Sequence, residues 1–166
     1  MTKSRASLRI AAVAAGLALA APAAAAPRIV LSIKQLREVV EQKGGTRTTR
    51  MEPARSVAPG DVVEYVLGYA NEGDEAATDA NIDDAIPKGT TYLAGTASGE
   101  GAQVAFSSDG GKTFAPAVKL TYEIRLPSGA VEKRVATPAE YTHVRFTLKR
   151  VPPGATGKVA FRVKVN

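Results

Sequence analysis

Three oxygen-bearing side chains alternate along the stretch DANIDDAIPKG and are the first candidates for chemistry. Asp79, Asn81 and Asp83 stand two residues apart, as the first ligands of an EF-hand calcium loop do. Such a loop also needs a glycine and a terminal glutamate, where this chain has aspartate and threonine. A weak cation site that uses Asp74, Glu75 or Asp79 stays an alternative, with no motif behind it. We predict no metal or other cofactor and interpret the alternation as a strand face in water.

His143 is the only histidine, and the chain has no cysteine to complete a zinc site with it. A small hydrolase built around His143 stays an alternative, although no Gly-x-Ser-x-Gly elbow accompanies this residue. In an alternating strand, His143 shares the outer face with Tyr141 and Arg145, opposite Val144 and Phe146. We therefore expect a surface histidine.

The stretch SSDGGKTF fits the Asp-box pattern that recurs in sialidases and other propellers. A propeller needs no fewer than about four blades of four strands, which is far more chain than this. In a hairpin, the Asp109 carboxylate can accept bonds from N–H groups across the turn, while Gly110 and Gly111 tolerate positive φ. We predict a rigid, non-catalytic hairpin between inward-facing Phe106 and Phe114.

Charge is segregated along the chain. Residues 61–100 carry nine acidic groups and one basic group, and residues 101–166 carry four acidic and eleven basic groups. If the last two alternating stretches, YTHVRFTLKR and GKVAFRVKVN, lie in one sheet, five cations share an exposed face that attracts anionic polymer or an acidic protein surface. The five are Arg145, Lys149, Lys158, Arg162 and Lys164. The alternative is a solubilising face with edge-protecting lysines.

The same segregation suggests partners. The basic face of one copy could meet residues Glu72 to Asp84 of another in a weak, salt-sensitive, head-to-tail contact. The other partners we consider are an unknown envelope protein and an anionic polymer. No P-loop or dinucleotide-binding glycine motif is present, and we expect no nucleic-acid partner.

Short alternating segments between glycine and proline turns run from Ile29 to the end of the chain. KGG at residues 43–45 indicates a hairpin turn after the first of them. In the next segment, four apolar residues share one face, namely Val63, Tyr65, Leu67 and Tyr69. The pattern predicts an all-β fold, an immunoglobulin-like antiparallel β-sandwich of about seven to nine strands.

The first 25 residues have the layout of a secretory signal peptide: a basic head, a short apolar run and a small-residue tail with cleavage sites at Ala23, Ala25 or Ala26. The apolar run is shorter than the roughly 20 residues that span a bilayer. We expect an exported protein, periplasmic or extracellular, with no transmembrane segment in the mature chain. Removing this segment lowers the formal charge from +6 to +3.

The stretch from Val57 to Gly99 resembles the bacterial conserved-repeat domain of unknown function, number eleven in its series. The matching positions are Pro59, Gly60, Asp61, Tyr65, Asn71, Gly73, Asp84, Ile86, Pro87, Gly89 and Tyr92. Ile86 replaces the commoner leucine, and the chain has one copy where many relatives have tandem arrays. The resemblance implies an immunoglobulin-like sandwich on exported or surface proteins and no catalytic residues. It makes Asp84 a structural acceptor at a turn and Pro87 the end of a strand.

These observations predict three segments: a signal peptide at 1–25, N-terminal strands that extend the sandwich at 26–56, and the conserved-repeat domain at 57–166. The function we predict is a non-catalytic, exported structural or interaction module of the bacterial cell envelope. One alternative is a binding module for anionic glycan or envelope polymer that uses the basic face. The other is the hydrolase built around His143.

Overall fold

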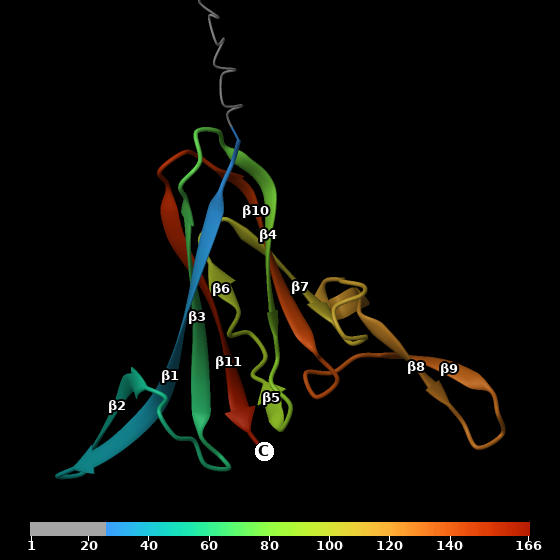
Figure 1. The fold of residues 1–166 in the computed structure, drawn as a ribbon. Coiled ribbons are helices and arrows are strands. Elements are labelled where there is room, and N and C mark those ends of the chain that lie inside the picture. Colours follow the sequence, from blue (N-terminus) through green and yellow to red (C-terminus); the bar gives the residue numbers. More distant parts are fainter. Residues whose placement is uncertain (1–25) are drawn as a thin grey trace, which may run out of the picture.

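The computed structural model describes residues 26–166, so the expected signal peptide lies outside the described residues. Within this range the chain forms eleven β-strands and one short 3-10 helix. Two antiparallel sheets pack face to face, and two hairpins project beyond them (Figure 1). The predicted all-β sandwich is confirmed. No helix between residues 26 and 166 has the length and hydropathy to cross a membrane.

The larger sheet has the strand order β2-β1-β3-β11-β5, with β6 also paired to β11. Its strands are β1 (Ile29–Lys43), β2 (Thr46–Pro53), β3 (Val62–Asn71), β5 (Thr90–Tyr92), β6 (Ser98–Gly99) and β11 (Thr156–Val165). The smaller sheet has the order β4-β10-β7. Its strands are β4 (Ala77–Ala85), β7 (Ala102–Ser107) and β10 (His143–Val151).

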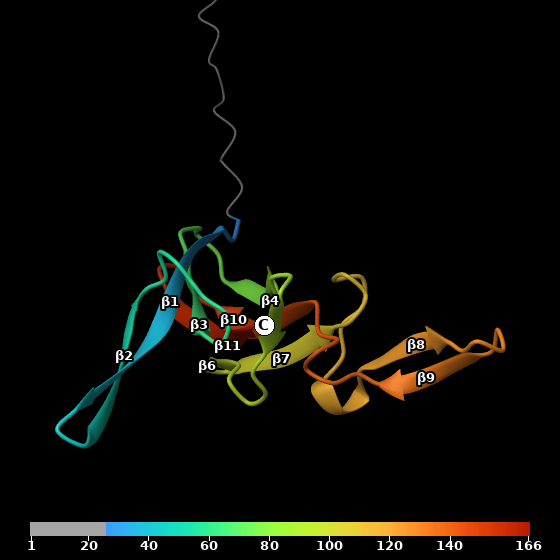
Figure 2. The same ribbon diagram turned by 90° about the horizontal axis from the view of Figure 1, so that it is seen from below.

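The remaining elements lie outside both sheets. The 3-10 helix η1 (Ala117–Lys119) leads into β8 (Thr121–Arg125), which pairs only with β9 (Val131–Val135). This two-stranded ribbon, called the β8–β9 hairpin below, extends away from the sandwich on the side opposite the β1–β2 hairpin (Figure 2).

Strand alternation places the core between the two sheets. In β11, Val159, Phe161 and Val163 are almost fully buried, and in β10 the same holds for Val144 and Phe146. Their sequence neighbours point to solvent, as a strand period of two requires. The Tyr65 ring stacks on Phe161, with ring centroids 5.2 Å apart. The expected inward face of β3 is confirmed, since Val63 and Leu67 are buried and Tyr65 and Tyr69 pack against the same core.

The two sheets do not have the same width. β5 of the larger sheet lies opposite β7 of the smaller one, because the rings of Tyr92 and Phe106 are only 4.8 Å apart. Counting strands from that end, β11 covers β10 and β3 covers β4. β1 is the next strand of the larger sheet, and no strand of the smaller sheet lies opposite it. The inner face of β1 therefore extends past the free edge of β4.

Asn71 at the end of β3 fixes the crossing between the sheets. Its side-chain amide donates to the carbonyls of Glu75 (2.7 Å) and Val151 (2.9 Å), and its side-chain oxygen accepts from the N–H of Gly73. The Asn71 carbonyl accepts from Gly154 in the turn between β10 and β11. Asn71 is almost completely buried with these bonds satisfied. These bonds hold the turn that connects β10 of the smaller sheet to β11 of the larger sheet, next to β3.

The predicted turns are present. Asp61 accepts from the N–H of Ala58 (2.9 Å), and Gly60 between them has φ of 92°. The KGG stretch turns β1 into β2 with positive φ at both glycines. β4 ends at Ala85, before Pro87, and Gly89 has φ of 79° in the following turn. These positions need glycine because L-residues avoid that region.

Candidate interaction surfaces

The outer face of β4 and β10 carries a ladder of cross-strand polar pairs. The Arg145 guanidinium donates to both carboxylate oxygens of Asp83, at 2.7 and 2.6 Å. Thr147 donates to Asn81 at 2.7 Å, and Lys149 donates to Asp79 at 3.2 Å. The three residues with calcium-like spacing thus form a strand face, and each is engaged by the basic or hydroxyl side chain opposite. Among residues 26–166 no three His, Cys, Asp or Glu side chains converge as metal ligands do.

The prediction that five cations of the last two strands share one exposed face is wrong. β10 belongs to the smaller sheet and β11 to the larger one, so their outer faces point to opposite sides of the sandwich. Arg162 donates to Glu64 (2.9 Å) and Glu38 (3.2 Å) on neighbouring strands. Lys158 and Lys164 lie exposed on that same outer face. The physical reason is that the chain crosses from one sheet to the other between β10 and β11, at a turn that Asn71 holds. In the sequence this turn is a short Pro-Pro-Gly stretch that looks like a simple hairpin turn within one sheet.

This pairing also weakens the expected head-to-tail contact. The acidic stretch and the basic stretch meet inside one molecule, because β4 lies beside β10 with Asp83 opposite Arg145. Charges that neutralise each other in one sheet present little net field to a second copy.

The Asp-box loop is a hydrogen-bonded hairpin, as predicted. Asp109 accepts from the N–H groups of Lys112 and Thr113, both at 3.0 Å, and from the hydroxyls of Ser107 and Thr113. These donors, led by the Thr113 hydroxyl, hold the pKa of Asp109 well below its usual range. Gly110 and Gly111 have positive φ. The Asp109 carboxylate therefore serves as a hydrogen-bond acceptor within its own loop.

Two side-chain orientations around this loop differ from the prediction. Phe106 faces inward, but it bridges to Ala115 rather than to Phe114. This offset by one residue turns the Phe114 ring outward, where the Arg145 guanidinium lies 3.8 Å from its centroid. Tyr141 precedes β10, and its ring packs on Phe106 in the core, with centroids 4.6 Å apart.

His143 lies on the outer side of β10, partly covered by Gly111. Its Nδ1 lies 3.2 Å from the Thr142 hydroxyl. The charge of His143 lowers the pKa of Asp84, so the two side chains are near each other. The Asp84 side chain points into the sandwich, however, and makes no hydrogen bond with the His143 ring. The hydrogen bonds that His143 makes therefore do not form a Ser–His–Asp relay.

Among residues 26–166, Asp84 carries a buried side-chain oxygen that has no hydrogen-bond partner. One carboxylate oxygen accepts from the N–H of Ala85 at 3.0 Å, in keeping with a structural acceptor, while Oδ2 is buried without a partner. Burial raises the pKa of Asp84, whereas the Ala85 N–H and the charge of His143 lower it. Burial, together with the Asp84 charge, also raises the pKa of Tyr65.

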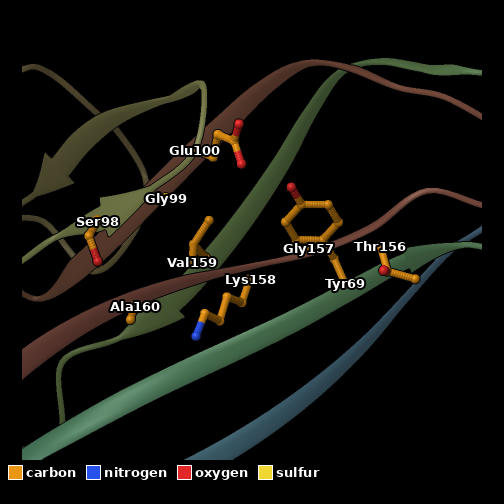
Figure 3. Close-up of a pocket in the computed structure, with 9 residues that line it drawn as sticks. All are labelled: Tyr69, Ser98, Gly99, Glu100, Thr156, Gly157, Lys158, Val159 and Ala160. Atoms are coloured by element: carbon orange, nitrogen blue, oxygen red, sulfur yellow. The ribbon is translucent and has the colours of Figure 1, made fainter.

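Of the pockets in the described residues, two border the β5–β6 side of the larger sheet. One, of about 380 Å³, opens where β6 ends and leaves the start of β11 uncovered (Figure 3). The Tyr69 ring lies over Gly157, where a Cβ would overlap the ring, and Glu100 stands at the rim. The other, of about 280 Å³, is lined mainly by apolar groups and includes the rings of Tyr92 and Tyr141. Neither brings a nucleophile and a base together.

Exposed apolar residues gather on β1. Four of the eight large hydrophobic side chains exposed in the described residues belong to this strand: Val30, Leu31, Ile33 and Val40. Leu31 and Ile33 lie opposite Tyr69 and Leu67 of β3, on the inner face of the larger sheet. They are 51% and 53% exposed, whereas Leu67 is 5% exposed. We call Leu31 and Ile33 together with the free edge of β4 the β1 overhang.

Comparison with known proteins adds no assignment: no family model, no curated protein and no solved structure matches the chain. The resemblance to the conserved-repeat domain therefore stays a prediction.

The β1 overhang was not found from the sequence. The alternation of Ile29, Leu31 and Ile33 signals a half-buried strand, yet it contains no information about the width of the opposite sheet. A usable signal is that all three of these residues are large and apolar, whereas exposed edge strands usually carry charged side chains.

Proposed function

We propose that the protein is a non-catalytic interaction module of the bacterial cell envelope, exported by its N-terminal segment, and that it binds an extended segment of another envelope protein at the β1 overhang. The observation that carries the proposal is the half-exposed pair Leu31 and Ile33 on a sheet face that is buried at the neighbouring strand. An apolar face that continues the core surface into solvent is typical of a binding site.

The free edge of β4 supports the same proposal. The N–H of Ile86 donates to the Thr142 carbonyl at 2.9 Å, which sets the phase of pairing between β4 and β10. By alternation, Asn81 and Asp83 direct their main-chain N–H and C=O groups away from β10. A segment paired there extends the smaller sheet toward β1, whose inner face carries the exposed Leu31 and Ile33. This arrangement is strand addition to a sheet edge, in which main-chain bonds give affinity and side-chain contacts give specificity.

Asp79 limits where such a segment can pair. It is the one non-glycine residue with positive φ, 47°, in the described part of the chain. A left-handed residue distorts the edge at the beginning of β4 and blocks continuous pairing there. The usable edge therefore runs from Asn81 to Ala85.

The test is site-specific photo-crosslinking in the native envelope. A photoreactive residue at Leu31 should capture a discrete protein, and Ile33→Glu should abolish the capture without a large change in melting temperature. The matched control places the photoreactive residue at Lys34, on the opposite face of the same strand. Equal capture at both positions, or capture that survives Ile33→Glu, would contradict the proposal.

A further inference from the structure

The β8–β9 hairpin is exposed on the face that carries Val131 and Val135, and on its other face only Tyr122 packs against the core. Val131 and Val135 of β9 are 55% and 61% exposed, and β8 and β9 pair with no other strand in the described residues. Figure 2 shows the hairpin extending from the body of the molecule. An isolated two-stranded ribbon is only marginally stable in water, and further strands stabilise it.

The hydrogen bonds at the two ends of the hairpin show which groups of β8 are free. The N–H of Leu126 donates to Ala130, and the N–H of Ala136 donates to Leu120, both at 2.8 Å. Even-numbered residues of β8 therefore bond to β9, and odd-numbered ones direct their N–H and C=O groups outward. The Thr121 carbonyl has the Ser108 hydroxyl 3.5 Å away. The outward groups of Glu123 and Arg125 form a free edge.

We propose that two copies of the protein pair along this edge, β8 against β8, in antiparallel register about a two-fold axis at Ile124. In this register Glu123 of each copy lies opposite Arg125 of the other, and these are the hydrogen-bonded positions that the free groups require. Ile124 faces Ile124, and Tyr122 faces Leu126 of the second copy. The product is a four-stranded sheet with the order β9-β8-β8-β9.

Charge and burial disfavour the neighbouring registers of a two-fold axis. Pairing centred on Glu123 or on Arg125 puts like charges opposite each other. A register centred on Tyr122 has to recruit Leu120, which is 3% exposed in the core.

The outer edge of β9 is protected in every comparable register. A two-fold axis at Glu132, at Lys133 or at Arg134 brings each of these side chains against its own copy. Such opposed like charges are a common device against unwanted edge pairing. The edge of β8, by contrast, has one register in which opposite charges meet.

The pairing is short and self-limiting. It ends where Pro127, which has no N–H, lies opposite Thr121 of the second copy. We expect a weak dimer with the same surface on both copies. The proposal uses the β8 edge and not the β1 overhang, so it stands or falls separately from the proposed function.

A single cysteine tests the axis directly, because the chain has no cysteine of its own. Residues that face each other in a non-hydrogen-bonded pair have Cα atoms about 4.5 Å apart. This separation lies within the range of about 4.4 to 6.8 Å that a disulfide bridges. Ile124→Cys should form a covalent dimer under mild oxidation at least tenfold faster than Val135→Cys, the exposed control on β9. Equal rates would overturn the proposal.

Charge reversal tests the register without a covalent bond. Glu123→Arg and Arg125→Glu each place like charges opposite each other, and each should abolish the dimer seen by sedimentation at low salt. An equimolar mixture of the two variants should dimerise again, because the two arginines of one variant then face the two glutamates of the other. A mixture that stays monomeric, or single variants that still dimerise, would overturn the register.

Discussion

The outer face of β4 and β10 and the β8–β9 hairpin both carry charged side chains on alternating strand positions. They differ in how closely the opposite charges pair. On the sandwich, Asp83 and Arg145 from distant parts of the chain form a two-bond ion pair. On the hairpin, Glu123 and Lys133 are 3.8 Å apart and mostly exposed, and Arg125 points into solvent beside a free edge. The cross-strand pair on the sandwich is therefore short and partly covered, whereas the cross-strand pair on the hairpin is longer and more exposed.

The largest contrast between the two regions should appear in stability. Phe161→Ala removes a fully buried ring that stacks on Tyr65, and it should lower the free energy of unfolding by about 3 to 5 kcal/mol. Tyr65→Ala should cost about 3 kcal/mol. Val135→Ser on the hairpin should change it by less than about 0.5 kcal/mol. Denaturant melts measure all three.

His143→Ala is the control inside the sandwich, since this ring lies at the surface and should cost much less than either aromatic change. A histidine variant less stable than the Phe161 variant would show that the assignment of inner and outer faces is wrong.

A smaller contrast should appear between the two ion pairs. A double-mutant cycle on Asp83 and Arg145, with each residue changed to alanine, should give a coupling of about 0.5 to 1 kcal/mol that falls at high salt. The same cycle on Glu123 and Lys133, at a protein concentration where the chain is monomeric, should give a coupling near zero. Equal couplings would remove the distinction between sandwich and hairpin.

The smallest effect concerns pH and the aspartates of β4. Burial raises the pKa of Asp84 above its ordinary value of 3.8, so the native state binds this proton more tightly than the unfolded chain. The contribution of Asp84 to stability is therefore most favourable in acid and is lost as pH rises through the folded pKa. Asp84→Asn should raise the melting temperature near neutral pH and lose this advantage in acid.

Asp83→Asn is the matched control one residue away. It removes the carboxylate that Arg145 binds, so it should lower the melting temperature near neutral pH. Thermal melts of both variants across pH provide the measurement. A loss of stability in Asp84→Asn at neutral pH would show that the buried carboxylate is favourable where it lies.

Part of this arrangement could be predicted from the sequence. Alternation identified the inner residues of β3 and β11, and turn chemistry identified Pro59, Gly60 and the Asp109 loop, because these depend on neighbours within a few residues. The orientation of Phe114 could not be predicted in the same way. It depends on whether Phe106 bridges to residue 114 or to residue 115, and a shift of one reverses the face.

The candidate surfaces depended on pairings between distant segments. The cations of β10 and β11 are real strand-face residues, but whether they share a face depends on Asn71, which holds the turn between these strands next to β3. The β1 overhang depends on the smaller sheet having one strand fewer than is needed to cover Leu31 and Ile33.

Local sequence was enough to establish which residues alternate, where the chain turns and which side of each strand is apolar, since side-chain direction has a period of two in any strand. Which strands are neighbours and which edges stay free followed only from the folded arrangement. That choice rests on contacts between residues far apart in the chain, such as Asn71 with Val151 and Asp83 with Arg145. Strand pairing of this kind brings together segments whose local patterns are alike, so local pattern cannot specify it.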